Sequence, residues 1–145
     1  RHASADPAEV AGRVVAVLRR TPEGARLDWR LDMPEGLAAA IGPEDLAEAL
    51  GALAENAARH ARSAVTVSAR AEDGALRLVV RDDGPGVPPD RLEALTRRGA
   101  RLDEGHAGVG LGLAIATEIA EAAGGDLALR NADPGLAAEL RLPRR

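Results

Sequence analysis

The sequence has no cysteine, no lysine and almost no aromatic side chains. Without cysteine, disulfides, thiol catalysis and cysteine-ligated metals are excluded, and the composition fits a reducing compartment. Trp29 is the single aromatic residue, so the chain has no stacking platform for single-stranded nucleic acid. All 19 basic residues are arginines, so guanidinium rather than ammonium groups must make any contact to phosphate. A P-loop, which requires a lysine, is excluded as well.

Long apolar runs are also absent. No run approaches the roughly 18 residues that a membrane-spanning helix needs, and no segment resembles a signal peptide. The net charge of −4 argues against a nucleic-acid partner. A length of 145 residues with 46% hydrophobic side chains predicts a single globular domain over residues 1–145. Because the first residue is an arginine, we expect the chain to be part of a longer protein.

Periodicity predicts the elements of the first half. Asp6 followed by proline is typical of a helix start, and the apolar spacing extends this helix over about 7–20. Alternation predicts a strand over 27–32, and the apolar run 37–41 predicts a short second strand that forms a hairpin with it. A second helix is expected over about 43–61.

The second half continues with alternating strands. Residues 65–69 and 76–82 are expected to pair around a tight turn, with Asp82 on the core side of its strand. An irregular loop follows. The remaining elements are a short helix over about 90–98, a connection without periodicity over 99–107, a helix over about 111–123 with Leu111, Ile115 and Ile119 on one face and Gly124 as its end, and a closing hairpin pairing 127–129 with 138–142.

This order of elements indicates an α+β fold. Three hairpins interleaved with helices predict a two-layer sandwich, in which one mixed, mostly antiparallel sheet is covered on one face by about three helices. The small number of βαβ units argues against a doubly wound parallel sheet.

The most informative segment is Gly-Val-Gly-Leu-Gly-Leu at 108–113, which leads directly into a helix. Glycine clusters commonly form turns. Alternate glycines before a helix also allow a bulky anion to approach the backbone and the positive end of the helix dipole. No strand is expected directly before the glycines, so a Rossmann turn does not fit.

Two polar residues give the glycines possible partners. An aspartate at an inward strand position, Asp82, is most simply a cap for the following turn, but it could also accept a hydrogen bond from the amino group of adenine. Asn56 in mid-helix is either tolerated there or an oxygen ligand for Mg²⁺. His60, near the border of the same helix face, could pack or donate to a phosphate.

Three segments together resemble one family. Residues 53–61 resemble the N-box of the ATP-binding domain of sensor histidine kinases, 82–88 resemble its G1 box, and 108–113 resemble its G2 box. The three occur in the order and spacing of the family, and the resemblance covers about 26–142. It implies the Bergerat ATP-binding fold, which is shared with gyrase B, Hsp90 and MutL.

The resemblance implies the roles of individual residues. Asn56 would ligate Mg²⁺, and Asp82 would bind the adenine amine beside Gly84 and Gly86. Residues 88–107 would form a lid over ATP, from which Arg98 or Arg101 would reach the γ-phosphate. The expected catalytic residues are Asn56, Arg59, Arg98 and Arg101, and the expected nucleotide-binding residues are Asn56, Arg59, His60, Asp82, Gly84, Gly86, Val87, Gly108, Val109, Gly110, Leu111, Gly112 and Leu113.

The sequence departs from the family pattern at two positions. Ala52 stands where the N-box begins with asparagine and where gyrase-type ATPases have a glutamate that activates water. A gyrase-like hydrolase is therefore not expected. Glu48 and Glu55 lie near Ala52 but point in other directions on the helix. Thr96 stands near the place of the family's F-box phenylalanine, so lid closure is expected to be anchored differently.

The family phosphorylates a histidine in a separate dimerisation domain. None of the three histidines of this chain is followed by an acidic residue, so the acceptor is expected outside the chain. The resemblance implies a monomeric fragment of a homodimeric, membrane-anchored sensor kinase, located in the cytosol, with a response regulator as partner. The alternatives are a serine kinase of the anti-sigma-factor type, and a nucleotide-binding interaction module that has lost phosphotransfer.

Overall fold

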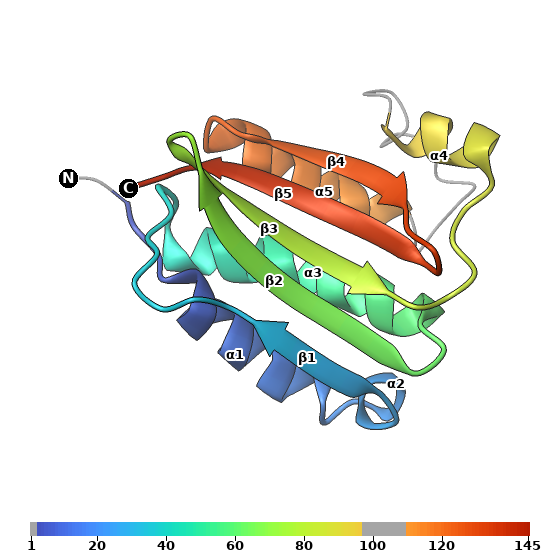
Figure 1. The fold of residues 1–145 in the computed structure, drawn as a ribbon. Coiled ribbons are helices and arrows are strands. Elements are labelled where there is room, and N and C mark those ends of the chain that lie inside the picture. Colours follow the sequence, from blue (N-terminus) through green and yellow to red (C-terminus); the bar gives the residue numbers. More distant parts are fainter. Residues whose placement is uncertain (1–2, 97–109) are drawn as a thin grey trace.

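The computed structural model describes residues 3–96 and 110–145, without the side chains of residues 96, 110 and 111. Ten helices and strands are found in these ranges (Figure 1). In chain order they are α1 (Pro7–Leu18), α2 (Pro22–Ala25), β1 (Asp28–Asp32), α3 (Pro43–His60), β2 (Ala64–Glu72), β3 (Ala75–Asp82), α4 (Pro89–Thr96), α5 (Gly110–Ala122), β4 (Asp126–Asn131) and β5 (Leu136–Pro143).

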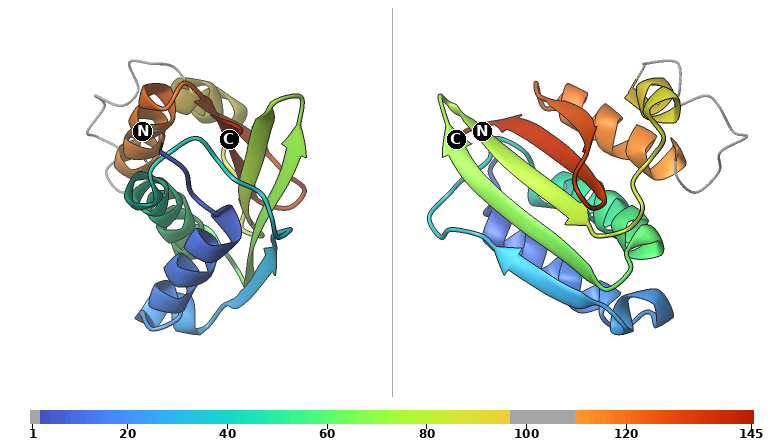
Figure 2. Two further views of the ribbon diagram at one scale, coloured as in Figure 1. Left: turned by 90° about the vertical axis from the view of Figure 1, so that its left-hand side faces the viewer. Right: turned by 45° about the vertical axis from the view of Figure 1, so that its right-hand side comes forward.

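The five strands form one sheet in the order β1-β2-β3-β5-β4. β1 runs parallel to β2, and the other three pairs are antiparallel. Helices α1, α3 and α5 lie side by side over one face of this sheet, while no described helix covers the other face (Figures 1 and 2). The predicted α+β sandwich with a mixed, mostly antiparallel sheet is confirmed.

The core lies between the sheet and these three helices. Alternate residues of the strands point to the helices, as the period of two requires. The largest fully buried side chains include leucines of α3, β3 and β5 and valines of α1 and β2: Leu46, Leu50, Leu53, Leu76, Leu78, Leu140, Leu142, Val10, Val15 and Val65. None of the helices in the described ranges is long and apolar enough to cross a membrane.

The helix starts follow the local sequence. Asp6 caps α1, where its Oδ1 accepts hydrogen bonds from the backbone N–H groups of Ala8 (3.0 Å) and Glu9 (3.4 Å). α1 ends at Leu18, two residues before its predicted end, and the short α2 occupies the predicted break. α3 begins at Pro43 and ends at His60, within one residue of the predicted bounds.

The predicted strand over 37–41 is wrong. Within it, Ala39 makes only isolated bridges, to Ala5 and to Arg144. The first predicted hairpin is therefore absent, and β1 pairs instead with β2, from Asp28 opposite Ala64 to Asp32 opposite Ser68. The connection between these parallel strands contains α3, which forms the single βαβ unit of the described chain.

Two predicted buried positions also differ from the structure. The alternation over 27–32 places Leu31 on the same inward face as Leu27 and Trp29, but Leu31, on the edge strand β1, is 42% exposed. In α5 the buried face consists of Leu113, Ala116 and Ala120, while Ile119 is only partly buried. The small side chains of this face allow α5 to pack closely against α3, so the helix is rotated relative to the predicted isoleucine stripe. The side chain of Leu111 lies outside the description.

The later boundaries agree with expectation where they are described. α4 begins at Pro89, and its predicted end at residue 98 lies outside the described residues, as does the connection over 99–107. Gly124 ends α5 with a φ of +89°, the left-handed conformation that a C-terminal glycine provides. The predicted closing hairpin is present, with Leu127 opposite Leu140 and Leu129 opposite Ala138.

Candidate functional site

Asn56 lies in the C-terminal part of α3. It is 4% exposed, and its Oδ1 accepts no hydrogen bond from any described residue. Leaving such a buried oxygen unsatisfied costs on the order of 1–3 kcal/mol. A carboxamide oxygen is also the hard type of ligand that Mg²⁺ prefers. The Oδ1 atom of Asn56 is therefore suited to contact a bound ligand or a metal ion.

Asp82 is the last residue of β3 and is also 4% exposed. Its Oδ1 accepts a hydrogen bond from the N–H of Gly84 at 2.8 Å, so the predicted cap of the turn is present. Burial raises the pKa of Asp82, against the opposing effects of hydrogen bonds from the backbone N–H groups of Gly84 and Leu136 and of the nearby His60. The carboxyl group of Asp82 is thus held at the end of β3 by two backbone N–H groups.

Asn56 and Asp82 are the only buried polar side chains in the described ranges, and they line the same cavity. The cavity has a volume of about 320 Å³, which lies within the range of small-ligand pockets. Its walls come from α3, the end of β3, the loop after β3, α4 and the start of β5. The lining residues are Asn56, His60, Asp82, Gly86, Val87, Pro88, Arg91 and Leu136.

The two glycines after Asp82 are required by close packing within the protein. A Cβ on Gly84 would lie 2.1 Å from the carbonyl oxygen of His60, a distance that no side chain tolerates. Gly86 has a φ of +77°, and a Cβ there would lie 2.8 Å from Oδ1 of Asn131. Both residues bring the loop against neighbouring elements, and of the two only Gly86 borders the cavity.

Asp83 is a residue that the sequence reasoning missed. Its Oδ1 accepts hydrogen bonds from the N–H groups of Arg62 (2.8 Å), Ser63 (3.0 Å) and Ala64 (3.2 Å), and its Oδ2 accepts one from the Ser63 hydroxyl (2.6 Å). Desolvation opposes ionisation, but these hydrogen bonds outweigh it and hold the pKa of Asp83 well below its usual range. Asp83 therefore joins the G1 segment to the loop after α3.

The last turn of α3 carries Arg59 and His60, and both are exposed. Nδ1 of His60 lies 2.9 Å from the carbonyl oxygen of Asn56, and the ring borders the cavity. The other reading of this histidine, as a core packing residue, does not fit its exposure. Arg59 does not line the cavity of the described residues, although it lies next to His60 at the same helix end.

The G2 segment is described only in part. Arg98, Arg101, Gly108 and Val109 lie outside the described residues, and Gly110 and Leu111 are described as the first residues of α5 without their side chains. A Cβ on Gly112 would lie 3.5 Å from the carbonyl oxygen of Ala52, which is an ordinary contact. The side chain of Leu113 is buried in the core, so only its backbone is available to a ligand.

Arg91, Pro88 and Leu136 also line the cavity, and none of them was predicted. Arg91 lies on α4, and Leu136 begins β5, 54 positions after Asp82. Arg91 could have been predicted, because it is a cationic residue about one helical turn after the G1 segment. Leu136 has no local signal, because a leucine that starts a strand is typical of an ordinary core position.

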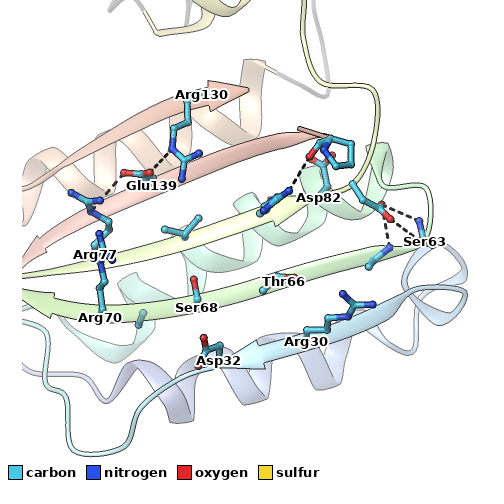
Figure 3. A pocket seen from close by; sticks show the side chains of 16 residues that line it. Arg30, Asp32, Ser63, Thr66, Ser68, Arg70, Arg77, Asp82, Arg130 and Glu139 are labelled. Atoms are coloured by element: carbon cyan, nitrogen blue, oxygen red, sulfur yellow. Dashed lines mark hydrogen bonds and ion pairs between the residues drawn. The ribbon is translucent and has the colours of Figure 1, made fainter. Parts of the chain in front are cut away.

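A larger hollow of about 670 Å³ lies on the uncovered face of the sheet (Figure 3). Two of its arginines pair closely with carboxylates: Arg77 with Glu72 at 2.7 Å, and Arg130 with Glu139 at 2.7 Å. Neither Asn56 nor His60 borders this hollow. It is therefore a solvated, largely ion-paired surface, and it meets the candidate cavity at Asp82, which lines both.

The chain is similar to proteins of a known family. The model of the histidine kinase-, DNA gyrase B- and HSP90-like ATPase family matches residues 42–145. Sensor protein kinase CarS of Pseudomonas aeruginosa is 44% identical over 125 residues, which are 86% of this chain and 28% of that protein. The chain thus spans about a quarter of the length of this relative.

Solved structures show the same fold. The mycobacterial sensor histidine kinase MprB superimposes with a TM-score of 0.84 and 27% identity, over 100% of this chain and 99% of that one. The full-length ShkA structure in complex with AMPPNP gives a TM-score of 0.80 and 25% identity, over 99% of this chain and 31% of that one. Together with the family match, these similarities show that the chain belongs to the histidine kinase-, DNA gyrase B- and HSP90-like ATPase family, as an ATP-binding domain of the sensor histidine kinase type.

Proposed function

We propose that this chain binds ATP with Mg²⁺ in the cavity between Asn56 and Asp82. The observation that carries the proposal is that the only two buried polar side chains of the described residues line this one cavity. One of them, Asn56, has an oxygen without a hydrogen-bond partner. The other, Asp82, is an acceptor beside an apolar wall. The first suits a cation, and the second suits the amino group of adenine.

Each residue of the proposed site contacts a different part of ATP. Asp82 accepts from the 6-amino group of adenine and disfavours guanine, whose carbonyl oxygen it would repel. Val87 and Leu136 cover the faces of the base. Asn56 offers its oxygen to Mg²⁺, which neutralises phosphate charge when bound. Arg59, Arg98, Arg101 and the glycines of 108–113 remain proposed contacts to the phosphates.

We further propose that the domain presents the γ-phosphoryl group to a histidine of a dimerisation domain in the same longer protein. The parent would be a homodimeric, membrane-anchored sensor kinase with its catalytic part in the cytosol, and a response regulator would receive the phosphoryl group. Similarity to sensor kinases such as CarS supports this proposal. In-line phosphoryl transfer depends on positioning and charge neutralisation, so the chain itself need not supply a base.

Ala52 favours transfer to a protein side chain over hydrolysis. It lies on α3 beside the first turn of α5, as its 3.5 Å approach to the Cβ position of Gly112 indicates. A water-activating carboxylate would be needed at this place for gyrase-type hydrolysis, and a methyl group cannot accept a proton. We expect the isolated domain to hydrolyse ATP slowly, and to need an added phosphoacceptor domain for phosphotransfer.

The binding proposal is tested by calorimetric titration with ATP in the presence and absence of Mg²⁺. We expect one site per chain and weaker binding without the metal. Asp82→Asn should abolish measurable binding, because the new amide presents a donor to the adenine amine while Oδ1 can still accept from Gly84. Asp32→Asn, an exposed aspartate of β1, serves as the control and should bind like the wild type.

Circular dichroism on each variant shows whether the fold is retained. A folded Asp82→Asn variant with unchanged affinity would overturn the assignment of Asp82. Binding that is independent of Mg²⁺ would overturn the role of Asn56. The absence of any ATP binding by the wild type would favour an interaction module without nucleotide function.

A further inference from the structure

One wall of the cavity is an irregular loop, residues 83–88, between β3 and α4. Two of its six residues are prolines, which have no N–H to donate. Within the loop, the N–H of Gly84 donates to Asp82 and the carbonyl oxygen of Pro88 accepts from Leu92. A loop with so few donors depends on other elements for its position.

Asn131, the last residue of β4, holds the peptide groups of Val87. The N–H of Val87 donates to Oδ1 of Asn131 at 2.9 Å, and Nδ2 of Asn131 donates to the carbonyl oxygen of Val87 at 2.6 Å. A carboxamide carries one acceptor and one donor side by side, so it complements both groups of a single residue. Aspartate would lack the donor, and leucine would lack both groups.

The neighbouring residues are shaped for this contact. Gly86 has no Cβ, and one placed there would lie 2.8 Å from Oδ1 of Asn131. Gly135, in the turn after Asn131, has a φ of +96°, and a Cβ there would overlap the carbonyl oxygen of Asp82. The N–H of Leu136 also bonds Asp82. The β4–β5 turn thus touches both Asp82 and the loop that faces it across the cavity.

Resting on the proposed nucleotide function, we propose that Asn131 is a positioning residue for the adenine end of the site. It fixes Gly86 and Val87 at a set distance from Asp82, through a turn that is itself closed by the hydrogen bond from Ala132 N–H to Gly135 oxygen at 2.8 Å. Asn131 does not line the cavity. It acts through the backbone of Val87, 44 positions earlier in the chain.

The test is calorimetric titration of adenosine, ADP and ATP with Asn131→Asp and Asn131→Leu. Loss of one or both hydrogen bonds should weaken binding of all three ligands by the same factor, about tenfold, because all three share the base. The number of sites per chain should stay at the wild-type value. Asp126→Asn, an exposed change at the other end of β4, is the matched control and should leave the affinities unchanged.

Each alternative outcome is distinct. A reduced number of sites with unchanged affinity would mean that Asn131 only stabilises the fold, and would overturn the proposal. Unchanged affinity, or a loss confined to ATP, would also overturn it. If the wild type itself bound no adenine nucleotide, the proposed function would fail. If the wild type bound and the variants bound equally well, only the role of Asn131 would fail.

Discussion

Two adjacent aspartates at the end of β3 have opposite environments. Asp82 points into the protein, where burial raises its pKa. Asp83, the first residue after β3, receives four hydrogen bonds from residues 62–64, which outweigh desolvation and lower its pKa. The difference between the two pKa values therefore follows from the burial of Asp82 and from the hydrogen bonds made to Asp83. One carboxylate is therefore available to a ligand, and the other braces the backbone.

Asp83 should make the domain more stable at neutral pH than in acid. Its pKa in the folded state lies below the unfolded value of about 3.9, so its contribution is present above that value and is lost as the pH falls through the folded pKa. Urea unfolding of the wild type and of Asp83→Asn at pH 7, 5 and 3 measures this. We expect the advantage of the wild type to shrink below about pH 4. An advantage that is constant with pH would contradict the account.

Gly84 and Gly51 form a matched pair of glycines. Gly84→Ala places a Cβ 2.1 Å from the His60 carbonyl oxygen, so the backbone must move, and we expect a loss of about 1–3 kcal/mol in the free energy of unfolding. Gly51→Ala in α3 meets no atom within 4 Å and should stabilise the domain by about 0.5–1 kcal/mol. Urea unfolding of both variants tests this. A neutral Gly84→Ala would mean that the loop does not pack on α3.

At the scale of elements, α3 carries the site at its C-terminal end, where the last carbonyl groups of a helix lack hydrogen-bond donors within the helix. The guanidinium group of Arg26 provides such donors. Its Nη1 donates to the carbonyl oxygen of Arg62 at 3.0 Å, and its Nη2 donates to those of Ala61 at 3.0 Å and Ala58 at 3.4 Å. The guanidinium also favours the negative end of the helix dipole. The turn that bears Asn56 and His60 is thereby held in place.

Removing this guanidinium should loosen the end of α3. We expect Arg26→Met to lower the free energy of unfolding by about 1–2 kcal/mol, and to speed hydrogen exchange of the amides of residues 57–61. Arg26→Lys keeps the charge but not the planar fork, so an intermediate loss is expected. Arg13→Met, an exposed arginine of α1, is the control. Equal effects of Arg26→Met and Arg13→Met would refute the role of Arg26.

Some of the strands could be predicted from the sequence, and some of their pairings could not. The paired strands β2 and β3 were predictable from their alternation, as was the inward direction of Asp82, because both depend on local period alone. The apolar run 37–41 has the composition of a strand but finds only the bridges of Ala39. The parallel partner of β1 lies beyond the whole of α3. Pairing between strands so far apart in the sequence produces no local sequence pattern from which it could be predicted.

The same limit explains the residues that were missed at the site. Asp83 reaches residues about 20 positions earlier, and Asn131 reaches a residue 44 positions earlier. Nothing near Asn131 in the sequence indicates a bond to Val87. Asn56 and Asp82 were found because each is a polar residue at a position where periodicity predicts a border or buried site. Their meeting in one cavity is a property of the fold.

For the whole molecule, the sheet has two unlike faces. Helices cover one face of the sheet (Figures 1 and 2), and the core lies between them and the strands. The cavity of Asn56 and Asp82 lies between α3 and the end of β3. The uncovered face carries arginines paired with carboxylates (Figure 3). A nucleotide bound as proposed would lie in the cavity and would meet the hollow of the uncovered face only at Asp82, which lines both.

The most direct test is an NMR titration of the labelled domain with a non-hydrolysable ATP analogue and Mg²⁺, followed by backbone amide shifts. The account predicts large shifts at the cavity, namely at Asn56, Gly86, Val87 and Leu136, and none at Thr66, Ser68 and Arg77 on the uncovered face. Shifts centred on the uncovered face, or none at the cavity, would contradict the central claim that Asn56 and Asp82 form the nucleotide site.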